Sequence, residues 1–112
     1  MSSNFNQKGD RIDWIENLLK TPIEDQRNYC LWRIIGPYLL NVRNLSKSET
    51  TIVMEDWLSK CDKLRKLDFE PKTKIYSIIK SNRGYKPISF LKLHEEGKEI
   101  YAILKPTINI YR

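Results

Sequence analysis

Apolar residues recur at three- and four-residue spacing along most of the chain, the spacing that places side chains on one face of an α-helix. The first series follows Asp10, a residue type that commonly caps a helix N-terminus. Its apolar members are Ile12, Ile15, Leu18 and Leu19. Residues 1–9 are mostly polar and lack this pattern, so we expect a flexible arm there. The pattern predicts a mainly α-helical fold, with a single domain over residues 10–112.

Two start signals place the middle helices. Thr21-Pro22-Ile23-Glu24 combines a capping threonine, a proline at the first helical position and a glutamate three residues after the cap, which predicts a helix from residue 22. Ser46-Lys47-Ser48-Glu49 is a second capping box and predicts a long helix over residues 47–67. Gly36-Pro37 predicts a kink or break, because proline removes a backbone donor. The core stripe expected for the long helix is Val53, Trp57, Cys61 and Leu64.

The last third of the chain contains three further helix signals. Pro71 can open a helix over residues 71–81, followed by a turn at Asn82-Arg83-Gly84. Ser89 can cap a short helix over residues 90–95, and Gly97 separates it from another over residues 98–105. A short β element is predicted near residues 85–88, and the tail at residues 107–111 is predicted to be either a strand or an interaction segment. The sequence therefore predicts a small bundle of about five to six helices.

The composition fits a domain that folds without a metal or a disulfide. The chain has 112 residues, of which 40% are hydrophobic, enough for one core. Cys30 and Cys61 cannot supply a four-thiolate centre and His94 is the only histidine, so we expect no metal and no cofactor. We expect two buried free thiols, with a Cys30–Cys61 disulfide as the alternative.

The N-terminus and the hydropathy give no sign of export or of a membrane. The segment MSSNFNQKGD has no apolar core of the kind found in signal peptides. The apolar runs are far shorter than the roughly 18 residues that suggest a membrane span. We therefore expect a soluble, cytoplasmic protein that does not bind membranes.

Positive charge is concentrated in one segment. The formal net charge is +6, and residues 71–94 hold six basic residues and no acidic one. Positions 72, 76, 80 and 83 fall on one helix face, where lysines can neutralise phosphates and a tyrosine can stack on a base. This pattern favours nucleotide or nucleic-acid binding over a merely solvated face. The residues concerned are Lys72, Lys74, Tyr76, Lys80, Arg83, Lys86 and Lys92.

No catalytic constellation accompanies this charge. The chain has no Gly-rich phosphate loop. Capping explains Asp10 and Asp13, and a solvated helix face explains Glu55-Asp56. We therefore predict a protein without enzymatic activity of its own.

Two arginines and three tryptophans complete the candidate residues. Arg27 and Arg33 lie in the second predicted helix and are candidate anion ligands, with an ion pair to Glu24 as the alternative for Arg27. The tryptophans occupy apolar helical positions, so we expect them to pack in the core rather than stack on bases. They are Trp14, Trp32 and Trp57.

Five blocks of the sequence together resemble a known family. Residues 27–42 read RNYCLWRIIGPYLLNV, residues 45–49 read LSKSE and residues 55–61 read EDWLSKC. Residues 74–80 read KIYSIIK and residues 84–93 read GYKPISFLKL. In this order the blocks resemble PriX, the family of small non-catalytic subunits of crenarchaeal DNA primase, and the resemblance covers about residues 25–104. It implies a helical domain similar to the C-terminal domain of the primase large subunit, without the iron–sulfur cluster of that domain.

The resemblance also implies a function. Such a subunit would support RNA primer synthesis by holding the initiating nucleoside triphosphate, the template DNA, or both. Its partners would be the catalytic small subunit and the large subunit of primase, with Mg²⁺ expected only in the catalytic subunit. The candidate binding residues are Arg27, Arg33, Lys72, Tyr76, Lys80, Arg83 and Lys86.

Two other functions fit the same pattern. A helix-turn-helix DNA-binding regulator would use residues 71–81 as its recognition helix and would bind duplex DNA alone. A structural adaptor would dock its basic face on an acidic protein and would bind no nucleotide.

Overall fold

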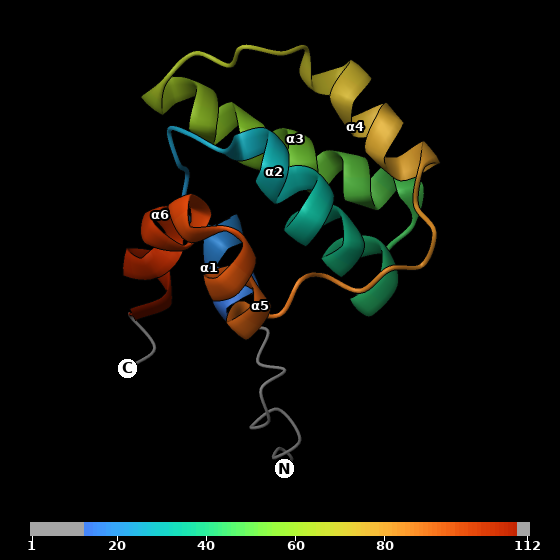
Figure 1. The fold of residues 1–112 in the computed structure, drawn as a ribbon. Coiled ribbons are helices and arrows are strands. Elements are labelled where there is room, and N and C mark those ends of the chain that lie inside the picture. The colour runs from blue at the N-terminus through green and yellow to red at the C-terminus, as the bar shows by residue number, and fades with distance from the viewer. Residues whose placement is uncertain (1–12, 110–112) are drawn as a thin grey trace. The chain divides into compact units, whose positions relative to one another are not determined.

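The computed structural model describes residues 13–109 and, among them, the side chains of residues 14–103. The chain packs into two compact units, one from the described parts of residues 1–21 and 88–112 and one from residues 22–87. The predicted mainly α-helical fold is confirmed (Figure 1). The arm at residues 1–9 and the Asp10 cap lie outside the described residues, and the single domain over residues 10–112 stays a prediction. No helix within residues 13–109 has the length and apolar character to cross a membrane.

The first unit brings together helices from both ends of the chain. α6 (Lys98–Asn109) contacts both α1 (Asp13–Leu19) and α5 (Phe90–Glu96). Ser89 caps α5 as predicted, its hydroxyl accepting a bond from the Lys92 amide at 3.1 Å. The Phe90 ring links the helices, with its centroid 5.9 Å from that of Trp14 and 5.3 Å from that of Tyr101. The buried apolar residues here are Trp14, Ile15, Leu18, Ile88, Leu93 and Ile100.

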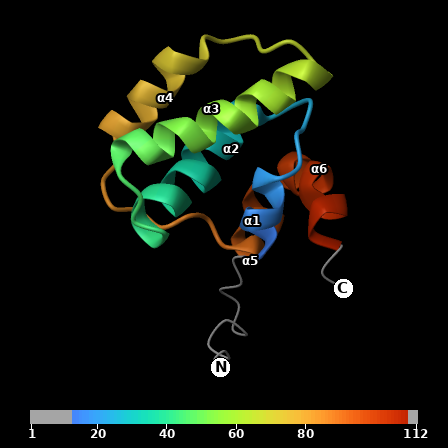
Figure 2. The ribbon, with the colours of Figure 1, turned by 180° about the vertical axis from the view of Figure 1, so that it is seen from behind.

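The second unit is organised around α3 (Lys47–Leu64). α3 packs against α4 (Pro71–Lys80) and against η3 (Tyr38–Val42). η3 continues the path of α2 (Arg27–Cys30) and η2 (Leu31–Ile35), and α3 lies beside both α2 and α4 (Figures 1 and 2). The apolar core consists of Ile23, Cys30, Leu31, Ile34, Ile35, Tyr38, Leu39, Met54, Trp57, Leu58, Cys61 and Ile75.

Both cysteines belong to this core. Cys30 and Cys61 are buried and free, so the structure has the thiols and not the disulfide. Burial raises the pKa of both thiols, which keeps them protonated at neutral pH.

The two predicted start signals at Ser46 and Pro71 are confirmed. The Ser46 hydroxyl accepts a bond from the Glu49 amide, and the Glu49 carboxylate accepts one from the Ser46 amide, both at 3.0 Å. Hydrogen bonding of the Glu49 carboxylate to the Ser46 backbone, and secondly to the Ser46 side chain, lowers the pKa of this carboxyl. Pro71 stands at the first turn of α4, after Glu70, whose carboxylate accepts a bond from the Lys72 amide at 3.4 Å.

The predicted start at residue 22 is wrong, since α2 begins at Arg27. Thr21 closes α1 instead of opening a new helix: its amide donates to the Leu18 carbonyl and its hydroxyl to the Asn17 carbonyl, both at 2.9 Å. Ile23 is buried, and its amide approaches the Cys61 sulfur at 3.5 Å. Burial of the Ile23 side chain therefore outweighs the local capping signal at Thr21. Gln26, at φ 60°, is the last residue before α2 begins.

The predicted kink or break at Gly36-Pro37 is replaced by a widened helix. η2 and η3 on either side are π-helical, with hydrogen bonds between residues five apart. The Gly36 amide donates to the Leu31 carbonyl, and the Arg43 amide donates to the Tyr38 carbonyl at 2.9 Å. The wider turn accommodates the donor missing at Pro37 without ending the helix.

Gly36 is where this widened helix meets α4. A Cβ at this position would lie 2.8 Å from Cγ2 of Ile78 and 2.8 Å from the Leu31 carbonyl oxygen. We expect Gly36→Ala to lower the free energy of unfolding by about 1–3 kcal/mol, because the methyl group would force η2 and α4 apart. Urea denaturation followed by circular dichroism measures this change. Thr73→Ala, at an exposed position of α4, is the control and should cost less than about 0.5 kcal/mol; equal midpoints for the two variants would contradict the close approach.

Other predicted boundaries also shift. α3 ends at Leu64 rather than at residue 67, and Leu64 is exposed, so the buried stripe consists of Thr50, Met54, Trp57, Leu58 and Cys61. Residues 85–88 form no strand, and the Tyr85 carbonyl accepts a bond from the Asn41 side-chain amide. α6 runs past residue 105 to Asn109, so the tail strand is wrong for residues 107–109, while residues 110–112 lie outside the described part.

Candidate functional site

The seven predicted binding residues do not converge on one concavity. Arg33 and Lys86 line one pocket, while Lys72, Tyr76 and Lys80 line a groove elsewhere. Arg27 is buried, and Arg83 lies in the exposed turn after α4. α4 ends at Lys80, so residue 83 does not continue the helical row that its spacing predicted. In the described structure the seven predicted binding residues therefore lie in a pocket, in a separate groove, in the interior and in an exposed turn.

Arg27 holds the end of α3. Its guanidinium donates to the carbonyl oxygens of Cys61 at 3.2 Å, Arg65 at 2.6 Å and Lys66 at 3.2 Å. These carbonyls belong to the last turn of α3 and the residues after it, and the Cys61 carbonyl also accepts a bond from the Arg65 amide at 3.0 Å. Arg27 is 5% exposed and its donors are engaged with backbone, so its geometry assigns it a structural role.

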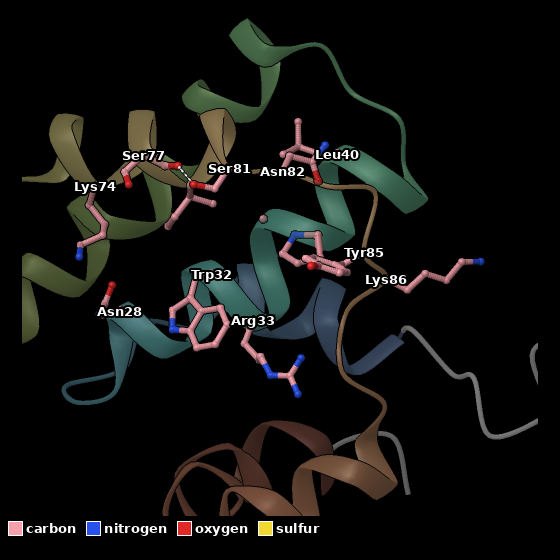
Figure 3. Close-up of a pocket in the computed structure, with 13 residues that line it drawn as sticks. Asn28, Trp32, Arg33, Leu40, Lys74, Ser77, Ser81, Asn82, Tyr85 and Lys86 are labelled. Atoms are coloured by element: carbon pink, nitrogen blue, oxygen red, sulfur yellow. Dashed lines mark hydrogen bonds between the residues drawn. The ribbon is translucent and has the colours of Figure 1, made fainter.

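A concavity of the second unit lies between η2 and α4, and we call it the Trp32 pocket. Its volume is about 620 Å³, within the range of small-molecule sites. One wall comes from α2, η2 and η3, another from α4 and the third from the loop after α4 (Figure 3). The lining residues are Asn28, Trp32, Arg33, Gly36, Pro37, Leu40, Lys74, Ser77, Ile78, Ser81, Asn82, Tyr85 and Lys86.

Trp32 is the main aromatic surface of the pocket. Its neighbours Leu31 and Ile34 point into the core, which leaves the indole on the opposite side of η2 and 52% exposed. The prediction that Trp32 packs in the core is therefore wrong, although it is right for Trp14 and Trp57. The ring is held at one edge by Tyr29, with centroids 6.0 Å apart and planes at 89°. An indole fixed in this way can receive a planar ring with little further ordering.

The charge of the pocket is positive. Arg33, Lys74 and Lys86 line it, and no aspartate or glutamate is among its described lining residues. Arg33 places its guanidinium carbon 5.8 Å from the Trp32 ring centroid. Figure 3 shows Lys74 reaching in from α4 on the same side as Asn28, whereas the Lys86 side chain extends away. Arg33 and Lys74 are therefore the cations best placed to meet an anion beside the indole.

A pair of asparagines fixes the loop that forms the third wall. The Asn41 amide donates to the Asn82 side-chain oxygen at 2.8 Å and to the Tyr85 carbonyl at 2.6 Å. Asn82 donates back to the Asn41 side-chain oxygen at 3.2 Å and accepts a bond from the Gly84 amide at 3.2 Å. Gly84 adopts φ 80°, the left-handed region that glycine enters without strain. The loop is thus tied to η3, with Tyr85 exposed at the pocket rim.

The sequence reasoning did not identify Trp32 and Asn41 as site residues, and it counted Lys74 in the basic segment without placing it in the candidate site. The sequence did contain a signal for the wall that α4 contributes to the Trp32 pocket, because positions 74, 77, 78 and 81 share one helix face. That face carries a lysine, two serines and one isoleucine. Nothing local marks Asn41, since its partners are more than forty residues away.

A second concavity lies between α3 and α4, and we call it the Tyr76 groove. Lys72, Tyr76 and Lys80 of α4 face Lys47 and Glu55 of α3 across a volume of about 450 Å³. Successive helical residues turn by about 100°, so this row lies on roughly the opposite side of α4 from Lys74 and Ser77. The cations predicted as one cluster are therefore distributed over two faces.

Metal ligands do not gather in either concavity. Within the described residues no three side chains of histidine, cysteine, aspartate or glutamate are close enough together to hold a metal ion. The ligands on offer in the Trp32 pocket are cations, amides, hydroxyls and aromatic rings, a set suited to a phosphate-bearing planar molecule.

The chain matches a known protein family. The family model described as Primase X, PriX, matches residues 10–108, which is most of the chain. No curated protein matches it.

Proposed function

The chain belongs to the PriX (Primase X) family, and from that premise we propose that it serves DNA primase as a non-catalytic subunit holding a nucleotide in the Trp32 pocket. Family membership associates the protein with primase. Beyond this association, we propose which ligand the protein binds and that it binds in the Trp32 pocket. The ligand is the initiating nucleoside triphosphate or, in its stead, an unstacked base of the template DNA.

The observation that carries the proposal is an exposed tryptophan beside cations in a pocket that no carboxylate lines. A base stacked on an aromatic ring contributes about 1–3 kcal/mol whatever its sequence. Arg33 lies beside the indole and adds positive charge to the pocket, and Lys74 adds a second charge from α4. An acidic side chain in the same wall would repel the phosphates, and none is among the lining residues.

The proposal divides the work between subunits. Phosphoryl transfer needs carboxylates that hold Mg²⁺ and a group that orients the nucleophile. The Trp32 pocket offers binding and orientation, so we place the carboxylates and the Mg²⁺ in the catalytic subunit of primase. A nucleotide held on rigid helices would be presented to that centre with its translational freedom already lost.

A titration of the full chain with ATP tests the proposal. We expect Lys74→Ala to weaken ATP binding by about tenfold, because a charge-assisted hydrogen bond contributes about 1.5–3 kcal/mol. Binding should also weaken as salt is added, because screening reduces the attraction between exposed charges. Isothermal titration calorimetry measures both effects, and Lys63→Ala, an exposed lysine of α3 that lines neither concavity, is the matched control.

The alternatives predict different outcomes. A helix-turn-helix regulator would bind duplex DNA with sequence preference and would be indifferent to ATP. A structural adaptor would bind no ATP at any salt concentration. Either result would rule out the nucleotide role while leaving the family assignment intact.

A further inference from the structure

We propose that the Tyr76 groove is a second nucleic-acid surface, which binds the backbone and bases of single-stranded DNA while the Trp32 pocket is occupied by a nucleotide. This goes beyond the proposed function, since it assigns a separate site. It rests on the primase role for its choice of nucleic acid over an acidic protein.

The first argument is the composition of the groove. Three lysines, Lys47, Lys72 and Lys80, surround it against one carboxylate, Glu55. The lysines come from two different helices, so their positive charges face a common space. Lysines arranged in this way bind phosphates by neutralising charge and releasing counterions, without reading sequence.

The second argument is Tyr76. Its side chain is 66% exposed, although α4 packs against α3. Its ring is not bare, because the Lys80 ammonium lies 5.7 Å from the ring centroid. Cations interleaved with an exposed aromatic ring are the pattern of proteins that bind single strands, where bases stack and the backbone meets the charges.

The third argument is length. Lys72 and Lys80 are eight residues apart on α4, or about 12 Å along the helix axis. Stacked nucleotides advance by about 3.4 Å each, so the row matches a strand of about three to four nucleotides. A single nucleotide would use only part of it. The geometry therefore points to a strand rather than a mononucleotide.

The two concavities lie on opposite sides of one helix. Lys74 and Ser77 face the Trp32 pocket, whereas Tyr76 and Ile79 face the Tyr76 groove. Because the two sets do not share a side chain, both sites can be filled at once. α4 would then separate a bound nucleotide from a bound strand by the thickness of a helix.

Fluorescence anisotropy of a labelled oligo-dT strand tests the proposal on the full chain. The groove variant is Lys72→Ala with Tyr76→Ala and Lys80→Ala. We expect it to lose at least about tenfold in strand affinity and to lower the slope of log affinity against log salt by about 1.4, the value for two lost phosphate contacts on a single strand. Its ATP affinity should stay that of the wild-type chain.

The control removes the same charge elsewhere. Lys60→Ala with Lys63→Ala deletes two exposed lysines of α3 that line neither concavity, and Lys60 pairs with Asp56 at 3.3 Å. This variant should bind oligo-dT nearly as well as the wild-type chain. Circular dichroism of all variants checks that the substitutions, which lie at exposed positions, leave the helices folded.

Several results would overturn the proposal. They are oligo-dT binding by the groove variant equal to that of the control, no oligo-dT binding by the wild-type chain at low salt, and competition by poly-glutamate as effective as by unlabelled oligo-dT. Loss of strand binding in Trp32→Ala with Lys74→Ala, but not in the groove variant, would place the strand in the Trp32 pocket. Failure of ATP binding with strand binding retained would instead refute only the proposed nucleotide site.

Discussion

Trp32→Ala is expected to weaken ATP binding by about 5- to 150-fold, corresponding to the roughly 1–3 kcal/mol of a base stacked on an aromatic ring. The side chain is half exposed and contacts Tyr29 only edge-on, so its loss should cost the fold little. Quenching of tryptophan fluorescence upon ATP addition follows binding to the wild-type chain. The buried Trp14 and Trp57 should contribute a constant background.

Two further variants separate stacking from other effects. Trp32→Phe keeps an aromatic face and should restore most of the affinity that alanine loses. Leu64→Ala removes an apolar side chain of similar exposure, 49% against 52%, and should leave ATP binding unchanged. An ATP affinity of Trp32→Ala equal to that of the wild-type chain would exclude the indole as the stacking surface.

Arg27→Ala is expected to destabilise the protein rather than to act on a ligand. The substitution removes three hydrogen bonds from a charged donor and leaves the carbonyls of Cys61, Arg65 and Lys66 without it. We expect the free energy of unfolding to fall by about 2–4 kcal/mol. Urea denaturation followed by circular dichroism measures the loss.

The conservative variant sharpens this test. Arg27→Lys keeps the charge but offers a compact ammonium in place of a planar fork, so it should recover only part of the stability. Arg65→Ala, at an exposed position near the same turn, is the control for removal of a positive charge. If Arg27→Ala unfolded at the wild-type urea concentration and lost ATP binding, Arg27 would be a ligand residue as its position in the sequence first indicated.

Arg27 shows why the roles of some candidate residues could not be predicted from the sequence. Its three partners lie 34, 38 and 39 residues further along the chain. A motif near position 27 says nothing about which carbonyls a distant helix leaves unpaired. The same separation hides Asn41, which meets Asn82 and Tyr85 only because the loop after α4 returns to η3.

Trp32 and Lys74 illustrate a different limit. Apolar spacing identified a helix through residue 32 whose inner side includes Leu31 and Ile34, and both are buried. Trp32 follows Leu31 directly, so its side chain points away from that inner side, and the prediction that all three tryptophans pack in the core did not account for this. The widened turns of η2 also shift the side-chain positions relative to an ideal α-helix. On α4 the periodicity was regular, and residues 72, 76 and 80 do share a face. Lys74 lies on another face of α4, and only the tertiary structure shows that this face lines the Trp32 pocket.

The sequence by itself determined what depends on short stretches of chain: the helical class, the caps at Ser46, Pro71 and Ser89, the turn at Gly84 and the excess of positive charge. These are set by hydrogen bonds and backbone preferences within a few residues. The tertiary structure alone decided that the cations divide between two faces of α4, that Trp32 is exposed and that Arg27 is buried. Those outcomes depend on which distant surfaces pack together, because the burial of apolar area can override a local signal, as it does at Ile23.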